Sequence, residues 1–144
     1  MRLPRPSFLL IAAAAIACSG DAFAPTAQNM TGTYYASTLT VTDSSGMHDI
    51  MAAGGSHITL TLMSNGTVGG SMLIKDGNGP GNDFAADMAG TWQLTGSTIT
   101  IDQTADTFVR DMPFTAGKGR ISGQLTTADG TVRVAMDIGT YVGY

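Results

Sequence analysis

Residues 57–74 read HITLTLMSNGTVGGSMLI, which is the pattern of a β-hairpin. Before the turn, apolar residues alternate with threonine, as they do in a strand with one face in a protein core and the other in water. Asn65-Gly66 is a dipeptide typical of tight hairpin turns. Gly69 and Gly70 interrupt the second arm and indicate a bulge or a bend. This hairpin is therefore the first element that the sequence predicts.

The same alternation recurs along the chain and predicts eight strands at a spacing of roughly twelve residues. In the first strand it places Tyr35, Leu39 and Val41 on one face. Pro113 implies an edge, a bulge or a strand end, because proline cannot donate to a sheet. Residues 50–55 stay ambiguous between a helical turn, a lid and the start of a strand. The expected strands are 32–42, 57–62, 67–74, 84–94, 98–103, 107–115, 118–126 and 131–139.

Eight short strands joined mostly by tight turns favour an up-and-down antiparallel β-barrel, because closure leaves no strand edge unpaired. Each strand has one aliphatic face, so the strands are expected to enclose a single core. The 19 glycines and the absence of Glu also favour strands and turns over helices. The expected fold class is thus all-β, with one barrel domain over residues 31–144.

Residues 1–17 have the order of a secretory signal: basic residues, then an apolar run, then small residues. About ten helical residues would reach only about 15 Å, half of a bilayer's hydrocarbon thickness, so this run is not a transmembrane anchor. Two cleavage sites compete. Residues 22–24 (AFA) have the small-x-small form, but Pro25 follows them and disfavours a cut there. Cleavage before Cys18 is therefore favoured.

Residues 15–18 (AIAC) resemble a lipobox, with Ala15 where leucine is usual, and Cys18 is the only cysteine. Cys18 is therefore predicted to carry the lipid anchor. Two or more acyl chains on this residue would hold the protein stably on a membrane. Residues 18–30 are expected to form a flexible tether. Ser19 after the cysteine resembles the pattern sorted to the outer membrane, which predicts a protein of the cell envelope facing the periplasm or the cell surface.

The composition argues against several functions. After Cys18 the chain has five Lys or Arg against eleven Asp, a formal charge near −6, which disfavours nucleic acid. Its cations are scattered, so no patch for anionic lipids is expected. His48 and His57 lie in no catalytic motif, and both are read as solvated side chains. The expectation is a monomer without enzymatic activity or cofactor.

Three segments together resemble small bacterial lipoproteins with a lipocalin-like barrel: Gly32-Thr33-Tyr34, Asn65-Gly66 and residues 90–101 (GTWQLTGSTITI). Lipocalins carry Gly-x-Trp on the first strand, whereas here Tyr34 stands in that place and the clear Gly-x-Trp lies in mid-chain. The usual disulfide and C-terminal helix are missing, so the resemblance concerns the barrel architecture. It implies an apolar cavity for a hydrophobic small molecule.

Two interpretations of the barrel interior stay open. In the first, aromatic side chains and Arg110 line a ligand cavity. Arg110 is included because it shares strand parity with the phenylalanines beside it, and it would be either a buried partner for a carboxylate or a residue at the rim. In the second, which the small size favours, the side chains of the barrel fill it. The candidate cavity residues are Tyr35, Trp92, Phe108, Arg110 and Phe114.

Residues 76–83 (DGNGPGND) superficially resemble a calcium loop, with Asp76, Asn78 and Asp83 as candidate ligands. Pro80 occupies a ligand position and the flanks are strands, so a plain hairpin tip explains the same residues and no metal is predicted. The leading hypothesis is a membrane-anchored, non-enzymatic barrel that binds a hydrophobic small molecule or has a structural role at the envelope. The alternative is a protein-interaction module that uses its outer surface or loops.

Overall fold

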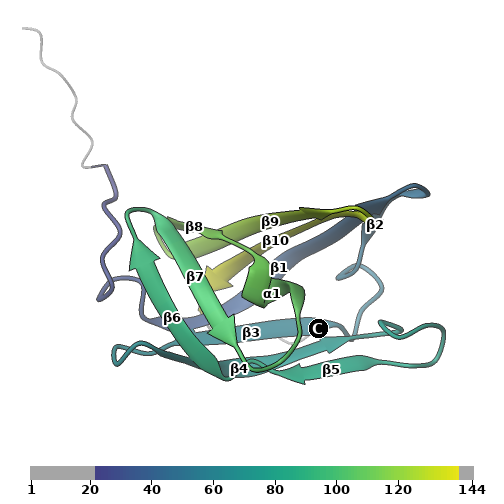
Figure 1. Cartoon of the computed structure of the whole chain (residues 1–144), viewed down its shortest axis with the longest axis horizontal. Coiled ribbons are helices and arrows are strands. Elements are labelled where there is room, and N and C mark those ends of the chain that lie inside the picture. Colours follow the sequence, from purple (N-terminus) through teal and green to yellow (C-terminus); the bar gives the residue numbers. More distant parts are fainter. Residues whose placement is uncertain (1–21, 140–144) are drawn as a thin grey trace, which may run out of the picture.

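The computed structural model describes residues 22–139. The predicted signal peptide (1–17) and Cys18 lie outside the described residues. Within these residues the chain forms one antiparallel sheet and one short helix, α1 (Figure 1). The elements are β1 (Gly32–Asp43), β2 (Gly46–Asp49), β3 (His57–Leu62), β4 (Thr67–Ile74), β5 (Phe84–Asp87), β6 (Gly90–Thr95), β7 (Thr98–Gln103), α1 (Phe108–Asp111), β8 (Phe114–Gly117), β9 (Arg120–Thr127) and β10 (Gly130–Ile138).

The sheet closes into a barrel because β1 pairs with β3 on one edge and with β10 on the other. Eight strands form the closed ring, in the order β1-β3-β4-β6-β7-β8-β9-β10, and neighbours are antiparallel. The predicted eight-stranded up-and-down barrel is therefore confirmed. The two shorter strands extend its wall at one end, since β2 pairs with the last residues of β1 and β5 pairs with the last residues of β4.

The predicted hairpin of residues 57–74 is confirmed as β3 and β4. Ile58, Leu60 and Leu62 are buried and alternate with threonine on the outer face, where Thr59 bonds Ser71 across the strands. The predicted strand 84–94 forms with a break at residues 88–89, which separates β5 from β6. The alternation of apolar and polar residues thus predicted where these strands lie in the sequence, and for β3 it also predicted which side chains face the core.

The strand predicted over residues 107–115 is wrong. The chain makes the helical turn α1 there, and β8 starts only after Pro113. Helical spacing buries Val109 and Met112, three residues apart, whereas strand parity would have buried Arg110 with its alternate neighbours. α1 has four residues, and within 22–139 no helix is long and apolar enough to cross a membrane.

The inward face predicted for the first strand is also wrong in part. The pairing of β1 with β10 shifts by one residue between Ala36 and Thr38, which is a β-bulge. A bulge moves the following side chains to the other face of the strand. Tyr34 and Leu39 are both buried as a result, while Tyr35 is only half-buried.

Residues 26–30 lie at one end of the barrel, called here the N-terminal end (Figure 1), and the Met30 side chain seals this end by packing into the core. This segment forms a helical turn in which Thr26 and Asn29 exchange two backbone-to-side-chain hydrogen bonds. Met30 is fully buried, and its carbonyl accepts a 2.9 Å hydrogen bond from the Tyr34 hydroxyl. Met30, the last residue of the tether expected over 18–30, therefore belongs to the barrel core.

In the long loop between β4 and β5, the Asp83 carboxylate binds two other groups of the chain. Asp83 accepts a 2.6 Å bond from Lys75 Nζ and a 3.2 Å bond from the backbone N–H of Asp76. The Lys75 ammonium and the Asp76 N–H lower the pKa of Asp83, and the carboxylate in turn raises the pKa of Lys75. The ionised form of Asp83 is thus the one that stabilises the loop.

Replacing Met30 tests the seal at the N-terminal end. We expect Met30→Ala to lower the free energy of unfolding by about 2–5 kcal/mol, because it leaves a cavity in the core. The matched control is Met47→Ala, since the Met47 side chain is 71% exposed and its truncation should change stability by less than about 0.5 kcal/mol. Urea titration followed by the fluorescence of Trp92 measures both variants. Equal effects would contradict the burial of Met30.

The Asp83 contacts predict a pH dependence of stability. Because the folded-state pKa is lowered, the contribution of Asp83 is present above the ordinary value of 3.8 and is lost as the pH falls through the folded pKa. Asp83→Asn should therefore be less stable than the wild type at neutral pH and equally stable in strong acid. Thermal unfolding across this range measures the difference, and a Lys75→Ala background should reduce it. A pH-independent difference would refute the role of the carboxylate.

Candidate ligand pocket

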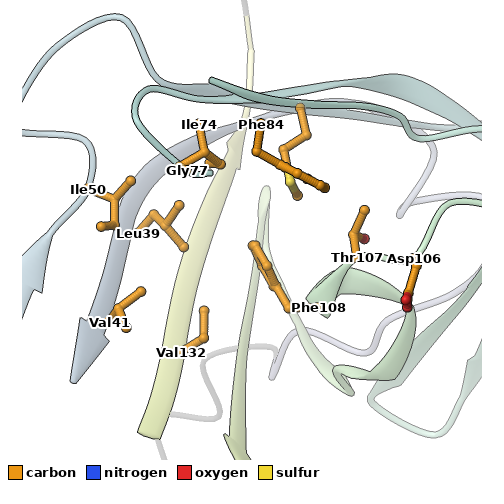
Figure 2. Close-up of a pocket in the computed structure, with 11 residues that line it drawn as sticks. Leu39, Val41, Ile50, Ile74, Gly77, Phe84, Asp106, Thr107, Phe108 and Val132 are labelled. Carbon is orange, nitrogen blue, oxygen red and sulfur yellow. The ribbon is translucent and has the colours of Figure 1, made fainter. Parts of the chain in front are cut away.

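The end of the barrel opposite Met30, called here the open end, contains a pocket of about 330 Å³. Its lining is mostly aliphatic and aromatic, with Asp106 and Thr107 as the polar side chains (Figure 2). The lining residues are Leu39, Val41, Ile50, Met72, Ile74, Gly77, Phe84, Asp106, Thr107, Phe108 and Val132.

The aliphatic wall of the pocket comes from the extended ends of β1 and β10. Val41 and Val132 are directly opposite each other in this pair, and Leu39 lies one inward position further into the barrel. Ile50 follows β2, and its backbone N–H donates to the Leu39 carbonyl at 2.9 Å. The bulge in β1 produces this wall, because it turns Leu39 and Val41 to the same face as Tyr34.

The facing wall comes from the β4–β5 hairpin. Ile74 and Phe84 form a cross-strand pair, and both pack against the barrel core. β5 stops at Asp87, and the sheet continues with β6, which pairs with β4 at only two positions. The hairpin therefore projects past the closed part of the barrel and faces the extension of β1 and β10, leaving the pocket between them.

The third side of the pocket is α1, which a buried polar network holds in place. The Thr107 hydroxyl donates to Gln103 Oε1 at 2.9 Å, and Gln103 Nε2 donates to the Met88 carbonyl at 3.2 Å. Both side chains are at least 94% buried, and each has its hydrogen-bond partner, as buried polar groups require. This network fixes Phe108 across the pocket from Phe84 (Figure 2).

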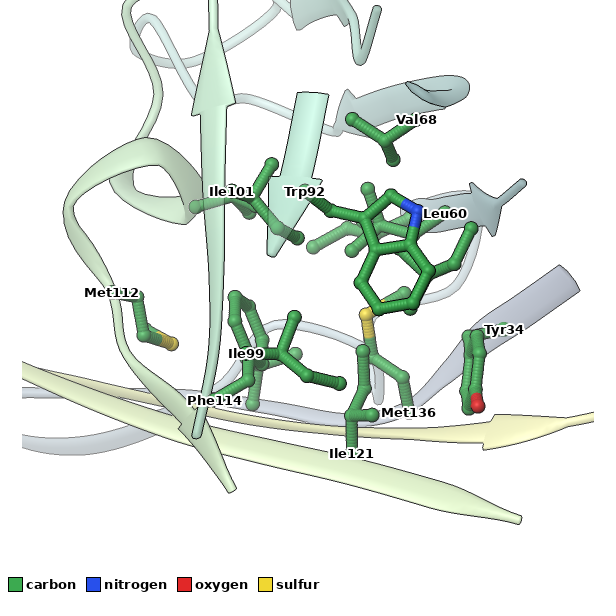
Figure 3. Packing of buried hydrophobic residues seen from close by; sticks show 14 of the residues in the cluster. Tyr34, Leu60, Val68, Trp92, Ile99, Ile101, Met112, Phe114, Ile121 and Met136 are labelled. Carbon is green, nitrogen blue, oxygen red and sulfur yellow. The ribbon is translucent and has the colours of Figure 1, made fainter. Parts of the chain in front are cut away.

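The predicted cavity residues do not gather at one site. Phe108 lines the pocket, whereas Trp92 and Phe114 belong to the packed core nearer the N-terminal end (Figure 3). The Trp92 indole N–H donates to the Met63 carbonyl at 2.9 Å, which fastens the β3–β4 turn. Tyr35 is half-buried and does not line the pocket. Side chains thus fill the barrel around Trp92 and Phe114, and the pocket lies at the open end.

Arg110 takes the rim position rather than an inward one. Its side chain is 35% exposed and pairs with Asp106 at 2.6 Å and with Asp111 at 3.4 Å. Hydrogen bonds and charge from these two carboxylates raise the pKa of Arg110, with Asp111 contributing most. Its cationic charge is therefore already matched by carboxylates of this chain.

Several pocket residues were missed because single-strand patterns do not show which end of a barrel is open. Phe84 begins a predicted strand and Val132 lies on a predicted inward face, yet neither was a cavity candidate. The available signal was the position of a residue along its strand. Inward apolar residues at the end of β1 and β4, and at the start of β5 and β10, all lie at the open end of the barrel.

The β1–β2 turn brings His48 close to a hydroxyl and a carboxylate. His48 Nε2 lies 2.8 Å from Ser45 Oγ and 3.5 Å from Asp43 Oδ1, and Ser45 donates to Asp43 at 2.6 Å. In a catalytic triad the carboxylate binds the other ring nitrogen and the serine donates to the histidine. Here the serine proton is directed to Asp43, and this bond is the main cause of the lowered pKa of Asp43. The contacts are those of an exposed turn.

The three calcium candidates lie in the β4–β5 loop, where their polar atoms bind other groups of the loop. Asp83 binds Lys75 and the N–H of Asp76, the Asp76 carboxylate accepts from Gly81 N–H, and Asn78 Nδ2 donates to the Asp83 carbonyl. Within residues 22–139, no group of three or more His, Cys, Asp or Glu side chains is arranged to hold a metal ion.

Comparison with known proteins does not assign the chain to a family. No protein-family model matches the chain, and neither a curated protein nor a solved structure matches it significantly.

Proposed function

We propose that the protein is a lipid-anchored, lipocalin-like carrier of the cell envelope that binds a hydrophobic small molecule in the open-end pocket. The observation that carries this proposal is the pocket itself, a hollow of about 330 Å³ with an almost entirely apolar lining. Ligand pockets in proteins start at about 300 Å³ and are lined mainly by hydrophobic side chains with a few polar groups. The protein acts by binding, without catalysis.

The energetic argument for a ligand is the exposure of apolar side chains at the open end. Val41, Ile74, Phe84, Phe108 and Val132 all remain only half-buried although they face the interior. Covering apolar surface with an apolar ligand contributes about 25 cal/mol per Å². An apolar chain that fills the pocket would therefore bury the part of the core that the barrel leaves uncovered.

The membrane anchor belongs to the same proposal. Cys18 would carry the acyl chains, and residues 18–25 would link them to the seal at the N-terminal end. The pocket opens at the opposite end from the point at which the chain enters the barrel at Met30. A ligand would therefore enter from the side of the barrel that lies away from the tether.

The alternative function, contact with another envelope protein, is favoured by one feature. β2 pairs with β1, and among the described strands none pairs with its other edge. Met47 at its centre is 71% exposed. A free edge with an exposed apolar side chain is a surface that another chain can extend by strand addition.

A charge placed in the pocket tests ligand binding. We expect Val132→Lys to weaken the binding of an apolar fluorescent probe at least about tenfold, because an ammonium group in the cavity must be desolvated. The matched control is Ile138→Lys, an exposed position on the same strand at the N-terminal end, which should bind like the wild type. Probe titration measures affinity, and Trp92 fluorescence checks folding. Equal binding by both variants would rule out this pocket as the site.

The anchor is tested in a diderm bacterium that produces the full chain. We expect wild-type protein to incorporate a labelled fatty acid and to fractionate with the outer membrane, and Cys18→Ser to lose both, because it removes the only thiol. The matched control is Ser19→Asp, which keeps Cys18 and should retain the label while moving to the inner membrane. Labelled lipid on Cys18→Ser would show that the anchor is elsewhere.

A further inference from the structure

We propose that the pocket selects a cationic amphiphile, meaning a single apolar chain that ends in an ammonium group. This inference rests on the proposed function, because it assigns a chemical class to the ligand of the same pocket. It comes from the charged residues in the loops and in α1 that contribute to the lining of the pocket, which are called here its mouth. The hydrophobic lining alone does not indicate the charge of the ligand.

The mouth of the pocket carries several carboxylates. Asp106 lines the pocket directly, and its side chain is 88% exposed. Asp111 follows on α1. Three further aspartates each directly precede a residue that lines the pocket: Asp49 before Ile50, Asp76 before Gly77 and Asp83 before Phe84.

The two cations in the same segments are already paired. Lys75 Nζ lies 2.6 Å from Asp83, and Arg110 binds both Asp106 and Asp111. Five aspartates against these two cations give these segments a formal charge of −3, and Asp106 is the one of the five that itself lines the pocket. A ligand carboxylate would therefore meet a negative field, and each mouth cation is held by a carboxylate of the chain.

The remaining cations of the described chain lie elsewhere. Lys118 and Arg120 flank the β8–β9 turn at the N-terminal end, where Arg120 faces Asp137 at 3.5 Å. Arg133 donates to Gln124 on the outer face of β10. Arg133 is next to Val132 in sequence but bonds Gln124 outside the pocket, so the cations beyond these segments lie either at the far end of the barrel or on its outer face.

The shape of the pocket places the two parts of such a ligand. Figure 2 shows Leu39, Val41 and Val132 on one side and Asp106 on the other, with Phe108 between them. The apolar chain would lie along the aliphatic wall, and the ammonium group would lie near Asp106 at the rim. A volume of about 330 Å³ is near the lower limit for ligand pockets, which favours one chain over two.

Three ligands with the same chain test the selection: decylamine, 1-decanol and decanoate. Calorimetry at pH 7 measures each, with the amine and the acid below their micelle concentrations and the alcohol below its solubility limit. At this pH the amine is cationic and the acid anionic. At low salt we expect the amine to bind about threefold to tenfold more tightly than the alcohol and the acid to bind more weakly than the alcohol. Near 1 M salt the three affinities should converge, because the charges are screened.

Asp106→Asn identifies the group responsible. It should weaken the amine and strengthen the acid, since it removes one carboxylate and leaves Arg110 with Asp111 alone, while the alcohol should bind unchanged. Asp137→Asn is the matched control, because it makes the same charge change in the Arg120 pair at the far end and should leave the low-salt order intact.

The outcomes separate this inference from the function on which it rests. Equal affinities at low salt, or an acid that binds as tightly as the amine, would overturn the cationic preference and leave hydrophobic binding standing. Failure of all three ligands to bind would overturn both. Amine binding that survives in Val132→Lys would reveal adsorption to the acidic surface and would also overturn the inference.

Discussion

The pairing of β1 with β10 is the constraint on which the rest of the structure depends. It runs from Tyr34 opposite Ile138 to Thr42 opposite Thr131, and it joins the first strand within residues 22–139 to the last one there. Closure supplies hydrogen-bond partners to both edges of the sheet, which an open sheet of this composition would expose. It also gives the inward side chains a single interior, so that one core can form without a disulfide. Removing this pairing would expose the core and the pocket together.

The division of the barrel into a packed part and a pocket results from the unequal lengths of its strands. The ring is complete where all eight strands overlap, and there Trp92, Phe114 and Met30 fill the interior. Beyond this zone only the longer strands continue, extended by β2 and β5, and they form two walls that no further strand joins. Because α1 closes just one side, the apolar faces of these extensions stay partly uncovered. The inward apolar residues that form the core thus continue along the longer strands and line the pocket.

Much of the fold could be predicted from the sequence, because alternation and turn residues act locally. Ile58, Leu60 and Leu62 on β3 face inward as their spacing indicates, and the turn at Asn65-Gly66 lies where its dipeptide indicates. The errors arise where a tertiary contact overrides a local pattern. The bulge after Ala36 has no marker in the sequence, and it reverses the face of the residues that follow.

The candidate site was harder to predict for the same reason. Thr107 hydrogen-bonds Gln103, and the chain then turns as α1, so that Arg110 reaches the rim and Phe108 the pocket. The prediction from strand alternation placed Phe108 and Arg110 on the same inward face of a strand. Which aromatic residues fill the core and which line the hollow depends on the overlap of all eight strands, and no single segment contains that information. Of five predicted cavity residues, Phe108 is therefore the one found in the pocket.

Amide hydrogen exchange of β1, resolved residue by residue by NMR, tests the closed barrel most directly. β1 pairs with β10 from Tyr34 to Thr42, apart from the bulge at Ser37, so its amides that point toward β10 should be among the slowest to exchange, with protection close to that of global unfolding. The β2 amides that point away from β1 should exchange fast. If the β1 amides that point toward β10 exchanged as fast as these, the sheet would be open and the pocket would have no aliphatic wall.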